Sequence, residues 1–152
     1  GYDVHRFQTG DHLMLCGIKI PFSKGLSGHS DADVALHAIT DAILGSAAAG
    51  DIGEYFPPED PKWKNSPSEV FLVEAHNIAK EKNLKLINID LTIVCEEPKI
   101  TPFKKVMIEY LSKVLQIDKE RVNIKGKTSE GLGFVGRKEG IAAFAIVNAQ
   151  KY

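Results

Sequence analysis

The sequence predicts a single α+β domain in which a mixed β-sheet carries helices on one face. Segments with strand-like alternation and segments with helical spacing follow one another without strict alternation. The length of 152 residues fits one domain, residues 1–152, with a continuous core. No helical segment remains to cover the second face of the sheet, so we expect the chain to form an oligomer.

The first part of the chain is expected to hold two strands followed by a helix. Alternation of apolar and polar residues predicts the strands, and the second strand is expected to bend at Gly17. Apolar residues at helical spacing predict the helix, which stops before Gly50. In order, these are strands at residues 2–7 and 13–21, a polar loop at 27–33 and a helix at 33–49.

Proline residues dominate the next segment, residues 51–61, and predict a long loop without regular structure. A helix is then expected to run to about residue 82. Its start resembles a capping box, with Ser66 as N-cap, Pro67 at N1 and Glu69 at N3.

The last part of the chain contains the clearest strand, residues 86–94. Its alternation is expected to place Ile87, Ile89, Leu91 and Ile93 together on one face. Further on we expect a helix at residues 101–115, a strand at 122–127, a glycine-rich turn at 131–140 and a strand at 141–148.

Composition excludes several classes of protein. Nineteen basic and 20 acidic residues give a net charge of −1, so nothing attracts the chain to nucleic acid or to an anionic membrane. No apolar run reaches the roughly 20 residues that span a bilayer. Cys16 and Cys95 form no C-x-x-C motif, which favours free thiols in a reducing compartment. We expect a cytoplasmic location, or an organelle if a leader precedes Gly1.

Asp3 and His5 are the first indication of a functional site. Two residues apart on a strand, they share one face, while Val4 is expected to point the other way into the core. His37, on the following helix, would add a third ligand. One carboxylate and two imidazoles suit zinc and leave a tetrahedral ion one open position. The alternative is an ordinary strand with solvated polar residues.

Asp33, His37 and Asp41 lie at i, i+4 and i+8 and share one helical face. Such a stripe is costly to bury without a purpose. Because a ligating histidine usually donates its second ring N–H, Asp33 or Asp41 would accept that hydrogen bond from His37. A solvated helix face with side-chain pairs is the alternative. The other histidine on a predicted helix, His76, is expected to be exposed.

Three loops near predicted strand ends have polar groups suited to a ligand. Residues 126–130, Gly-Lys-Thr-Ser-Glu, could cradle phosphate oxygens, although a plain turn is the better explanation of this segment by itself. Residues 95–101 leave the clearest strand and would offer backbone groups to a ligand, or form a simple connection. Residues 131–137 lack the context of a nucleotide-binding glycine motif. Arg137 and Glu139 would form a surface pair.

Taken together, these segments resemble the 2-C-methyl-D-erythritol 2,4-cyclodiphosphate synthase family of the non-mevalonate isoprenoid pathway. The pieces occur in the family's order and span essentially the whole chain. They are Gly1-Tyr2-Asp3-Val4-His5, residues 28–34, Leu36-His37-Ala38, Gly50-Asp51-Ile52-Gly53, Phe56-Pro57, Pro98-Lys99, residues 128–130, Gly133-Phe134 and residues 136–140.

The resemblance implies a homotrimer with active sites between adjacent subunits, and a phosphorus–oxygen lyase reaction. The 2-phosphate of 4-diphosphocytidyl-2-C-methyl-D-erythritol 2-phosphate would attack the β-phosphorus of the same molecule. That attack expels CMP and closes 2-C-methyl-D-erythritol 2,4-cyclodiphosphate. Two cations would reduce the repulsion between the phosphates, and one substrate carries both reacting groups. Since the nucleophile is already ionised, no strong base or nucleophilic triad is required.

The resemblance also assigns roles to residues of this sequence. Zn²⁺ or a similar divalent ion would bind Asp3, His5 and His37, and Mg²⁺ or Mn²⁺ would bridge the diphosphate with help from Glu130. The expected catalytic residues are His29 and Thr128. The expected substrate-binding residues are Asp3, Val4, His5, His29, Ser30, Asp51, Ile52, Gly53, Phe56, Asp60, Cys95, Lys99, Thr101, Lys127, Thr128, Ser129, Glu130, Phe134 and Arg137.

Two positions depart from the family pattern. Pro58 stands in a loop that often reads Phe-Pro-Asp-Thr-Asp, which puts one substrate contact in doubt although Asp60 is kept. Lys127 replaces a common threonine and would add positive charge against phosphate. Two other functions fit the same residues: a zinc-dependent phosphoesterase, and a non-catalytic zinc-stabilised trimeric binding protein.

Overall fold

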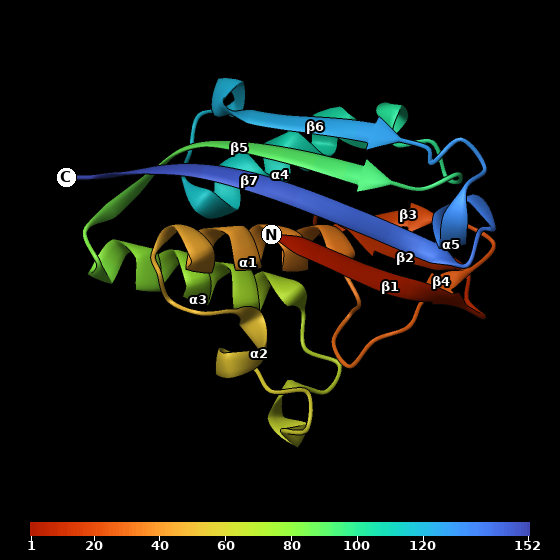
Figure 1. Ribbon diagram of the computed structural model, residues 1–152, viewed down its shortest axis with the longest axis horizontal. Coiled ribbons are helices and arrows are strands. Elements are labelled where there is room, and N and C mark those ends of the chain that lie inside the picture. Colours follow the sequence, from red (N-terminus) through yellow and green to blue (C-terminus); the bar gives the residue numbers. More distant parts are fainter.

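A five-stranded sheet and a separate two-stranded hairpin form the β-structure of the protein (Figure 1). The computed structural model describes all residues, 1–152. The sheet has the order β4-β1-β7-β5-β6, in which β5 and β6 are parallel and the other pairs are antiparallel. Its strands are β1 (Tyr2–Gln8), β4 (Gly25–Leu26), β5 (Leu84–Val94), β6 (Val122–Lys127) and β7 (Gly140–Lys151), and the hairpin pairs β2 (His12–Leu15) with β3 (Ile18–Pro21).

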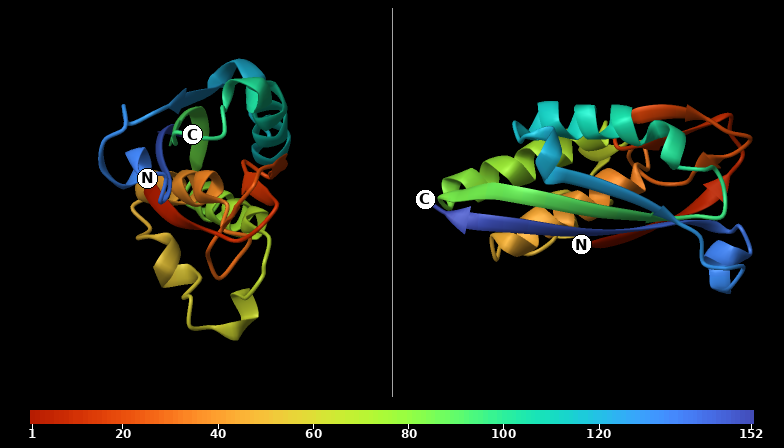
Figure 2. Two further views of the ribbon diagram at one scale, coloured as in Figure 1. Left: turned by 90° about the vertical axis from the view of Figure 1, so that its right-hand side faces the viewer. Right: turned by 90° about the horizontal axis from the view of Figure 1, so that it is seen from above.

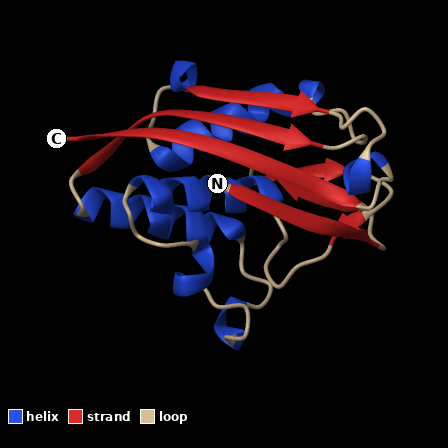
Figure 3. Ribbon diagram, in the orientation of Figure 1, coloured by secondary structure: helices blue, strands red, loops and turns tan.

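Three long helices cover one face of the sheet, as predicted, and no helix covers the other (Figures 2 and 3). Of these, α1 packs on β1 and β7, α3 packs on α1 and β5, and α4 packs on β6. They are α1 (Val34–Ser46), α3 (Ser68–Glu81) and α4 (Lys104–Leu115), and two short helices, α2 (Ile52–Tyr55) and α5 (Gly133–Gly136), lie in the loops. This confirms the α+β fold with a mixed sheet.

Helix α1 lies at the centre of the core because it is buried between the sheet and α3. Its alanines, among them Ala35 and Ala38, are fully buried and let the neighbouring backbones approach closely. Asp33 ends the loop before α1 and serves as its N-cap, accepting a hydrogen bond from Leu36 N. The core therefore fixes the rotation of α1 and with it the direction of His37.

The open face of the sheet exposes apolar side chains. On β1, Tyr2 and Val4 are 47% and 41% exposed, and on β7, Phe144 and Ile146 are 50% and 65% exposed. Tyr2 and Phe144 are register partners whose rings lie 4.8 Å apart. Val4 thus points away from the core of the chain, and the prediction that it lies in the core was wrong. Asp3 and His5, on either side of Val4, instead lie on the helix-covered face of β1.

The segment at residues 13–21 forms two strands, which corrects the prediction of one bent strand. The chain reverses at Cys16 and Gly17, both of which have positive φ (50° and 71°). The ring of Tyr110 occupies the space where a Cβ at position 17 would lie, so a glycine is required there. The hairpin packs on α1 and α4 and takes no part in the main sheet.

Helix α3 begins at Ser68 instead of using the predicted capping box. Pro67 is the N-cap residue, and the hydroxyl of Ser66 donates to Lys62 O at 3.4 Å. The first turn is satisfied from far along the chain, because the carboxylate of Asp31 accepts a hydrogen bond from Ser68 N at 3.1 Å. A distant carboxylate therefore replaces the local cap.

A bulge in β5 shifts the predicted alternation. Leu86 is buried and Ile87 only partly so, and the strand register shifts between Leu86 and Asn88. Beyond that point Ile89, Leu91 and Ile93 are buried as predicted. The face assigned to Ile87 was wrong because one extra residue reverses the pattern.

Several loops and one strand differ from expectation. The predicted irregular loop contains α2 and a 3₁₀ turn at Pro61–Trp63, and the predicted glycine-rich turn contains α5. Strand β7 continues to Lys151 because β5 pairs along its whole length.

His76 is buried, not exposed, and burial together with Lys80 lowers its pKa to about 4. None of the helices has the length and apolar content that a bilayer crossing requires.

Candidate metal centre and adjoining pockets

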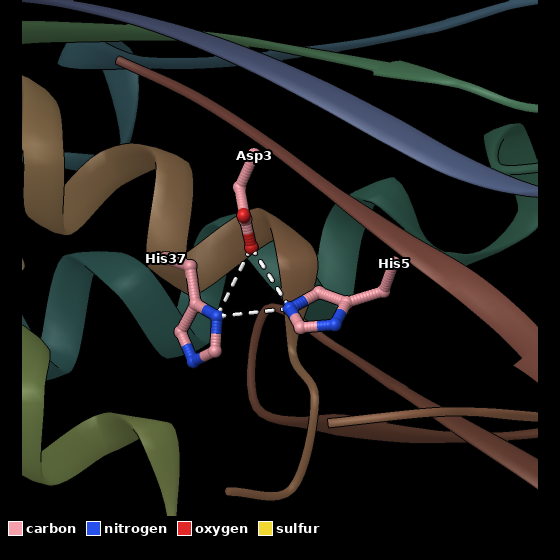
Figure 4. Close-up of side chains that lie close together, drawn as sticks. All are labelled: Asp3, His5 and His37. Carbon is pink, nitrogen blue, oxygen red and sulfur yellow. Dashed lines mark hydrogen bonds and ion pairs between the residues drawn. The ribbon is translucent and has the colours of Figure 1, made fainter. Parts of the chain in front are cut away.

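Asp3, His5 and His37 meet at the helix-covered face of the sheet (Figure 4). Strand β1 directs the first two side chains toward α1, and α1 directs His37 back toward them. Asp3 Oδ2 lies 2.9 Å from His5 Nε2 and 3.0 Å from His37 Nδ1, and the two ring nitrogens are 3.1 Å apart. All three residues are partly buried. The three residues predicted from the sequence as metal ligands therefore form one cluster in the structure.

The ring of His5 is oriented by the loop that precedes α1. Its Nδ1 lies 2.7 Å from Ser27 O, which can only accept a hydrogen bond, so Nδ1 carries the hydrogen. Nε2 then faces Asp3 and His37, and a cation bound there would take its lone pair. Gly28 permits this approach, because a Cβ there would lie 3.0 Å from His5 Cε1.

The second ring nitrogen of His37 contacts serines, not the predicted aspartates. Nε2 lies 2.8 Å from Ser68 Oγ and 3.1 Å from Ser30 Oγ. Sequence reasoning placed Ser30 at the site but missed Ser68, which comes from a different helix. No sequence signal distinguishes Ser68 from an ordinary helix-start serine.

Asp33 and Asp41 are occupied elsewhere, so the prediction that one of them supports His37 was wrong. Asp33 is fully buried and accepts hydrogen bonds from Cys16 N at 3.0 Å and Gly17 N at 2.7 Å, in addition to its capping bond. Burial raises the pKa of the Asp33 carboxyl to about 6. Asp41 accepts a hydrogen bond from Ile52 N at 2.8 Å and anchors α2. Both carboxylates therefore accept hydrogen bonds from backbone N–H groups and not from His37.

The electrostatics of the cluster favour a cation. Burial opposes ionisation of Asp3, but hydrogen bonds with His37 and His5 lower its pKa to about 2. Burial alone would lower the pKa of His5, and the hydrogen bond and charge of Asp3 outweigh it and raise that pKa. A negative carboxylate and two imidazoles thus share a small, partly dry space.

The spacing of the three atoms fits a zinc-sized ion. Ligands of a tetrahedral zinc at about 2.0–2.1 Å lie about 3.3 Å from one another. The observed separations of 2.9, 3.0 and 3.1 Å are close to that value. Oxygen and imidazole nitrogen are ligands that zinc and similar divalent ions accept. The residues present therefore fit a divalent metal, with one coordination position left for a ligand.

A cavity of about 250 Å³ adjoins the cluster. His5 and His37 form part of its wall, and five other residues predicted for the site line it: His29, Ser30, Ile52, Gly53 and Phe56. Pro58, Trp63 and Phe71 also line the cavity and were not predicted. Their rings pack around Phe56, with centroids 5.1 Å (Trp63) and 4.6 Å (Phe71) away. An aromatic wall of this kind suits an apolar part of a ligand.

Asp51 and Asp60 are not among the residues that line this cavity. Asp51 is the N-cap of α2 and accepts a hydrogen bond from Glu54 N, and Asp60 accepts one from Lys62 N. Both therefore shape the loop that carries Ile52 and Phe56. Their expected contacts with substrate stay predictions.

A second, smaller pocket of about 180 Å³ lies where β5 and β6 end. Five predicted residues line it: Cys95, Lys99, Thr101, Lys127 and Thr128. Gly126 is needed there because a Cβ would lie 2.8 Å from Ile100 Cβ. Burial and the charge of Glu96 raise the pKa of the Cys95 thiol to about 11, so this cysteine contributes shape and not a thiolate.

Glu96 organises the loop beside this pocket and was missed from the sequence. Its Oε1 accepts hydrogen bonds from Ser129 N at 2.9 Å and Ser129 Oγ at 3.1 Å, and these bonds lower the pKa of Glu96. Ser129 thereby orients its neighbours, while Glu130 is exposed with a positive φ of 55°.

Phe134 and Arg137 lie apart from both pockets. Phe134, in α5, shares a hollow of about 390 Å³ with Val4, His5 and Arg6 on the open face. Arg137 pairs with Glu139 at 3.0 Å on the surface, as predicted.

The two pockets are separate within one chain. They share no lining residue. The metal cluster sits on β1, while the second pocket begins at the ends of β5 and β6, and β7 lies between them in the sheet. At about 4.8 Å per strand, β1 and β6 are roughly 14 Å apart.

Comparison with known proteins finds one family that matches almost the whole chain. A profile of the YgbB family matches residues 1–150. The bifunctional enzyme IspD/IspF of Bartonella bacilliformis is 57% identical over 145 residues, which are 95% of this chain and 36% of that protein. That of Bartonella henselae is 56% identical over 97% of this chain and 37% of its own length. The chain thus spans little more than a third of the curated relatives it matches.

Solved structures agree in fold over almost the whole chain. The bifunctional IspDF of Campylobacter jejuni matches with a TM-score of 0.96 and 43% identity, over all of this chain and 41% of that one. A 2C-methyl-D-erythritol-2,4-cyclodiphosphate synthase matches with a TM-score of 0.90 and 40% identity, over 99% of this chain and 97% of that one. IspF of Plasmodium falciparum, solved as a CDP complex, matches with a TM-score of 0.87 and 36% identity, over 99% of this chain and 93% of that one.

Proposed function

This chain belongs to the YgbB family, and from that premise we propose that it is a cyclodiphosphate synthase domain acting in isoprenoid biosynthesis. It converts 4-diphosphocytidyl-2-C-methyl-D-erythritol 2-phosphate to 2-C-methyl-D-erythritol 2,4-cyclodiphosphate and CMP. The observation that carries the proposal is the convergence of Asp3, His5 and His37 beside a cavity lined by the other motif residues. Relatives with this printed activity match the chain along its length.

Asp3, His5 and His37 hold the proposed divalent cation, for which zinc suits the donor set. When bound, this cation and a Mg²⁺ or Mn²⁺ near Glu130 supply positive charge that offsets the repulsion between the reacting phosphates. The ring of His5 is held by Ser27 O, so its Nε2 faces the cation site without adjustment. Preorganisation of this kind lowers the cost of binding.

The cavity beside the cluster binds the methylerythritol end of the substrate. Ser30 and His29 offer polar groups to the 2-phosphate, and His29 and Thr128 contact the reacting groups as catalytic residues. Phe56 and its aromatic neighbours exclude water around the carbon skeleton. Excluding water matters because hydrolysis would open the product.

The pocket at the ends of β5 and β6 binds the cytidine end. Backbone groups of residues 95–101 meet the base, and Lys127 with Thr128 and Ser129 meets the diphosphate. Lys99 and Lys127 are exposed and form no ion pair within the chain, so their charge is available to phosphate.

In the reaction an oxygen of the 2-phosphate forms a new bond to the β-phosphorus, and the bond from that phosphorus to the CMP oxygen breaks. No water is consumed, and the displaced oxygen leaves as part of CMP. The nucleophile is anionic from the start, so this chain's residues need only align the groups and exclude water.

A homotrimer completes the site, because one chain keeps the two pockets apart. The metal-side cavity of one protomer would face the cytidine pocket of its partner. The exposed apolar side chains of the open sheet face, Tyr2, Val4, Phe144 and Ile146, would be buried by this assembly. Phe134 and Arg137 lie next to that face.

A steady-state assay tests the proposed function. The protein, supplied with Zn²⁺ and Mg²⁺ and the cytidyl substrate, should release CMP together with a cyclic diphosphate that is free of solvent oxygen. Variant His5→Ala should abolish CMP release, while His12→Ala, which alters an exposed histidine paired only with Asp11, should not.

Product analysis in ¹⁸O water separates the alternatives. An open product carrying solvent oxygen would instead identify a phosphoesterase. Binding of zinc without any release of CMP would identify a binding protein. Either result would reject the synthase.

A further inference from the structure

Ser68 is a polar side chain without solvent exposure, and it lies against the outer nitrogen of His37. Its Oγ is 2.8 Å from His37 Nε2 and is also hydrogen-bonded to Asp31 Oδ1. The other carboxylate oxygen of Asp31 accepts the hydrogen bond from Ser68 N. Burial of a hydroxyl is costly unless it is hydrogen-bonded, so this arrangement has a defined partner on each side.

The chemical groups determine which atom donates in each hydrogen bond between Asp31, Ser68 and His37. An ionised carboxylate only accepts, so the hydroxyl of Ser68 donates to Asp31. The oxygen of Ser68 then presents its lone pair to His37, and His37 Nε2 must carry the ring hydrogen. Nδ1, on the other side of the ring, faces Asp3 Oδ2 and His5 Nε2, and a cation bound between these atoms would take its lone pair.

We propose that Ser68 and Asp31 are positioning residues that accept the Nε2–H of His37 and so aim its Nδ1 at the cation. This inference rests on the metal site of the proposed function and deepens it. His5 is set by a backbone carbonyl, Ser27 O, and His37 is set by a buried serine–carboxylate pair. Each imidazole ligand therefore has its own hydrogen-bond acceptor.

Asp31 is itself held between two helix starts. Its Oδ1 also accepts a hydrogen bond from Asp33 N at 3.1 Å, just before α1, while Ser68 begins α3. Its own backbone N donates to Ser66 O at 3.2 Å. The carboxylate therefore cannot turn away without breaking contacts in both segments, which keeps the Ser68 hydroxyl in one orientation.

Ser30 is the competing acceptor for His37 Nε2. It lies farther away, at 3.1 Å, and its Oγ also accepts a hydrogen bond from Ala32 N at 3.3 Å. Its Oγ also lies 3.3 Å from Ser68 Oγ, but Ser30 has no carboxylate partner and lines the cavity. The shorter contact therefore assigns the Nε2–H of His37 to Ser68 with Asp31, and Ser30 faces the ligand side.

The matched test compares Ser68→Ala with Ser66→Ala. Ser66 lies two residues away and its hydroxyl touches only Lys62 O. Proton–nitrogen NMR of the Zn²⁺-bound protein reads the Nε2–H of His37, which exchanges slowly with water when it is hydrogen-bonded, and competition with a coloured chelator reads the Zn²⁺ affinity. We expect a slowly exchanging Nε2–H in the parent chain, faster exchange in Ser68→Ala, and a loss of about 10–100-fold in Zn²⁺ affinity.

Ser66→Ala should retain both the slowly exchanging Nε2–H signal and the affinity. Asp31→Asn provides a second variant, expected to weaken Zn²⁺ binding in the same direction, and the thermal midpoint is measured for each. The proposal is overturned if Ser68→Ala keeps the Nε2–H signal and the parent affinity, or if Ser30→Ala alone reproduces the loss. Failure of the parent chain to bind Zn²⁺ would reject the metal site, whereas equal Zn²⁺ affinity in the parent chain and in Ser68→Ala would reject the role of Ser68 alone.

Discussion

The metal cluster and the pocket at the ends of β5 and β6 differ in how much of each one chain supplies. The cluster is partly buried, and both of its imidazoles have fixed outer partners. The second pocket is bordered by Lys99 and Lys127, which are exposed and without ion pairs. The comparison indicates that the proposed cation site is preorganised within a protomer, whereas the proposed phosphate-binding pocket depends on the groups that a partner and a ligand bring to it.

Removing a ligand should break the preorganised region most severely. In His37→Ala one of three metal ligands is lost, and Zn²⁺ affinity should fall by more than about 100-fold, since changes to the outer partners alone cost 10–100-fold. Circular dichroism should remain that of the parent, because His37 lies at the border of the core. Full metal occupancy in this variant would show that the cluster is not the site.

Disrupting the open face should separate the two regions. Ile146→Lys places a charge on a side chain that is 65% exposed in one chain and buried in the proposed trimer. Native mass spectrometry should show a shift from trimer to monomer, because burying an unpaired lysine costs several kcal/mol.

The metal content of Ile146→Lys is the second measurement on this variant. Each monomer should still bind one Zn²⁺, while CMP release should fall below a tenth of the parent rate. Loss of Zn²⁺ on dissociation would mean that the cluster needs a partner.

A lysine substitution should affect only the pocket of the β5–β6 end. Lys127→Ala removes one charge that faces the diphosphate and should weaken CDP binding by about tenfold, as expected for a charge-assisted hydrogen bond. Lys85→Ala, at the opposite end of β5, is the matched control. Isothermal titration should show unchanged Zn²⁺ affinity in both variants.

The pH dependence of metal binding should be a graded effect, without loss of the site. Asp3 has a pKa of about 2 and stays ionised at neutral pH, but the pKa of His5 is raised by Asp3. A proton on His5 competes with the cation, so Zn²⁺ affinity should rise with pH by about tenfold per unit until His5 is neutral, and then level off. A flat profile between pH 5.5 and 8 would contradict this coupling.

The sequence predicted those parts that depend on local pattern. Strand alternation was enough to bring Asp3 and His5 to one face, and helical spacing was enough to place α1 and therefore His37. The register shift in β5 defeated the same reasoning at Ile87, because a bulge leaves no mark in residue type. The turn at Cys16 and Gly17 was read as a bend, since only the backbone shows the positive φ of both residues.

The support of His37 could not be predicted because it is non-local. Asp33 and Asp41 have the right spacing, yet both bind backbone groups of other segments. Ser68 and Asp31 lie far apart in sequence and meet only because α3 packs on α1. A residue's type and spacing therefore predict a ligand more readily than the partner that orients it.

X-ray diffraction at the zinc absorption edge tests the central claim most directly. Crystals grown with Zn²⁺ should show one anomalous peak per chain, about 2.0–2.1 Å from Asp3 Oδ2, His5 Nε2 and His37 Nδ1. A peak elsewhere, or none within reach of these three atoms, would contradict the account.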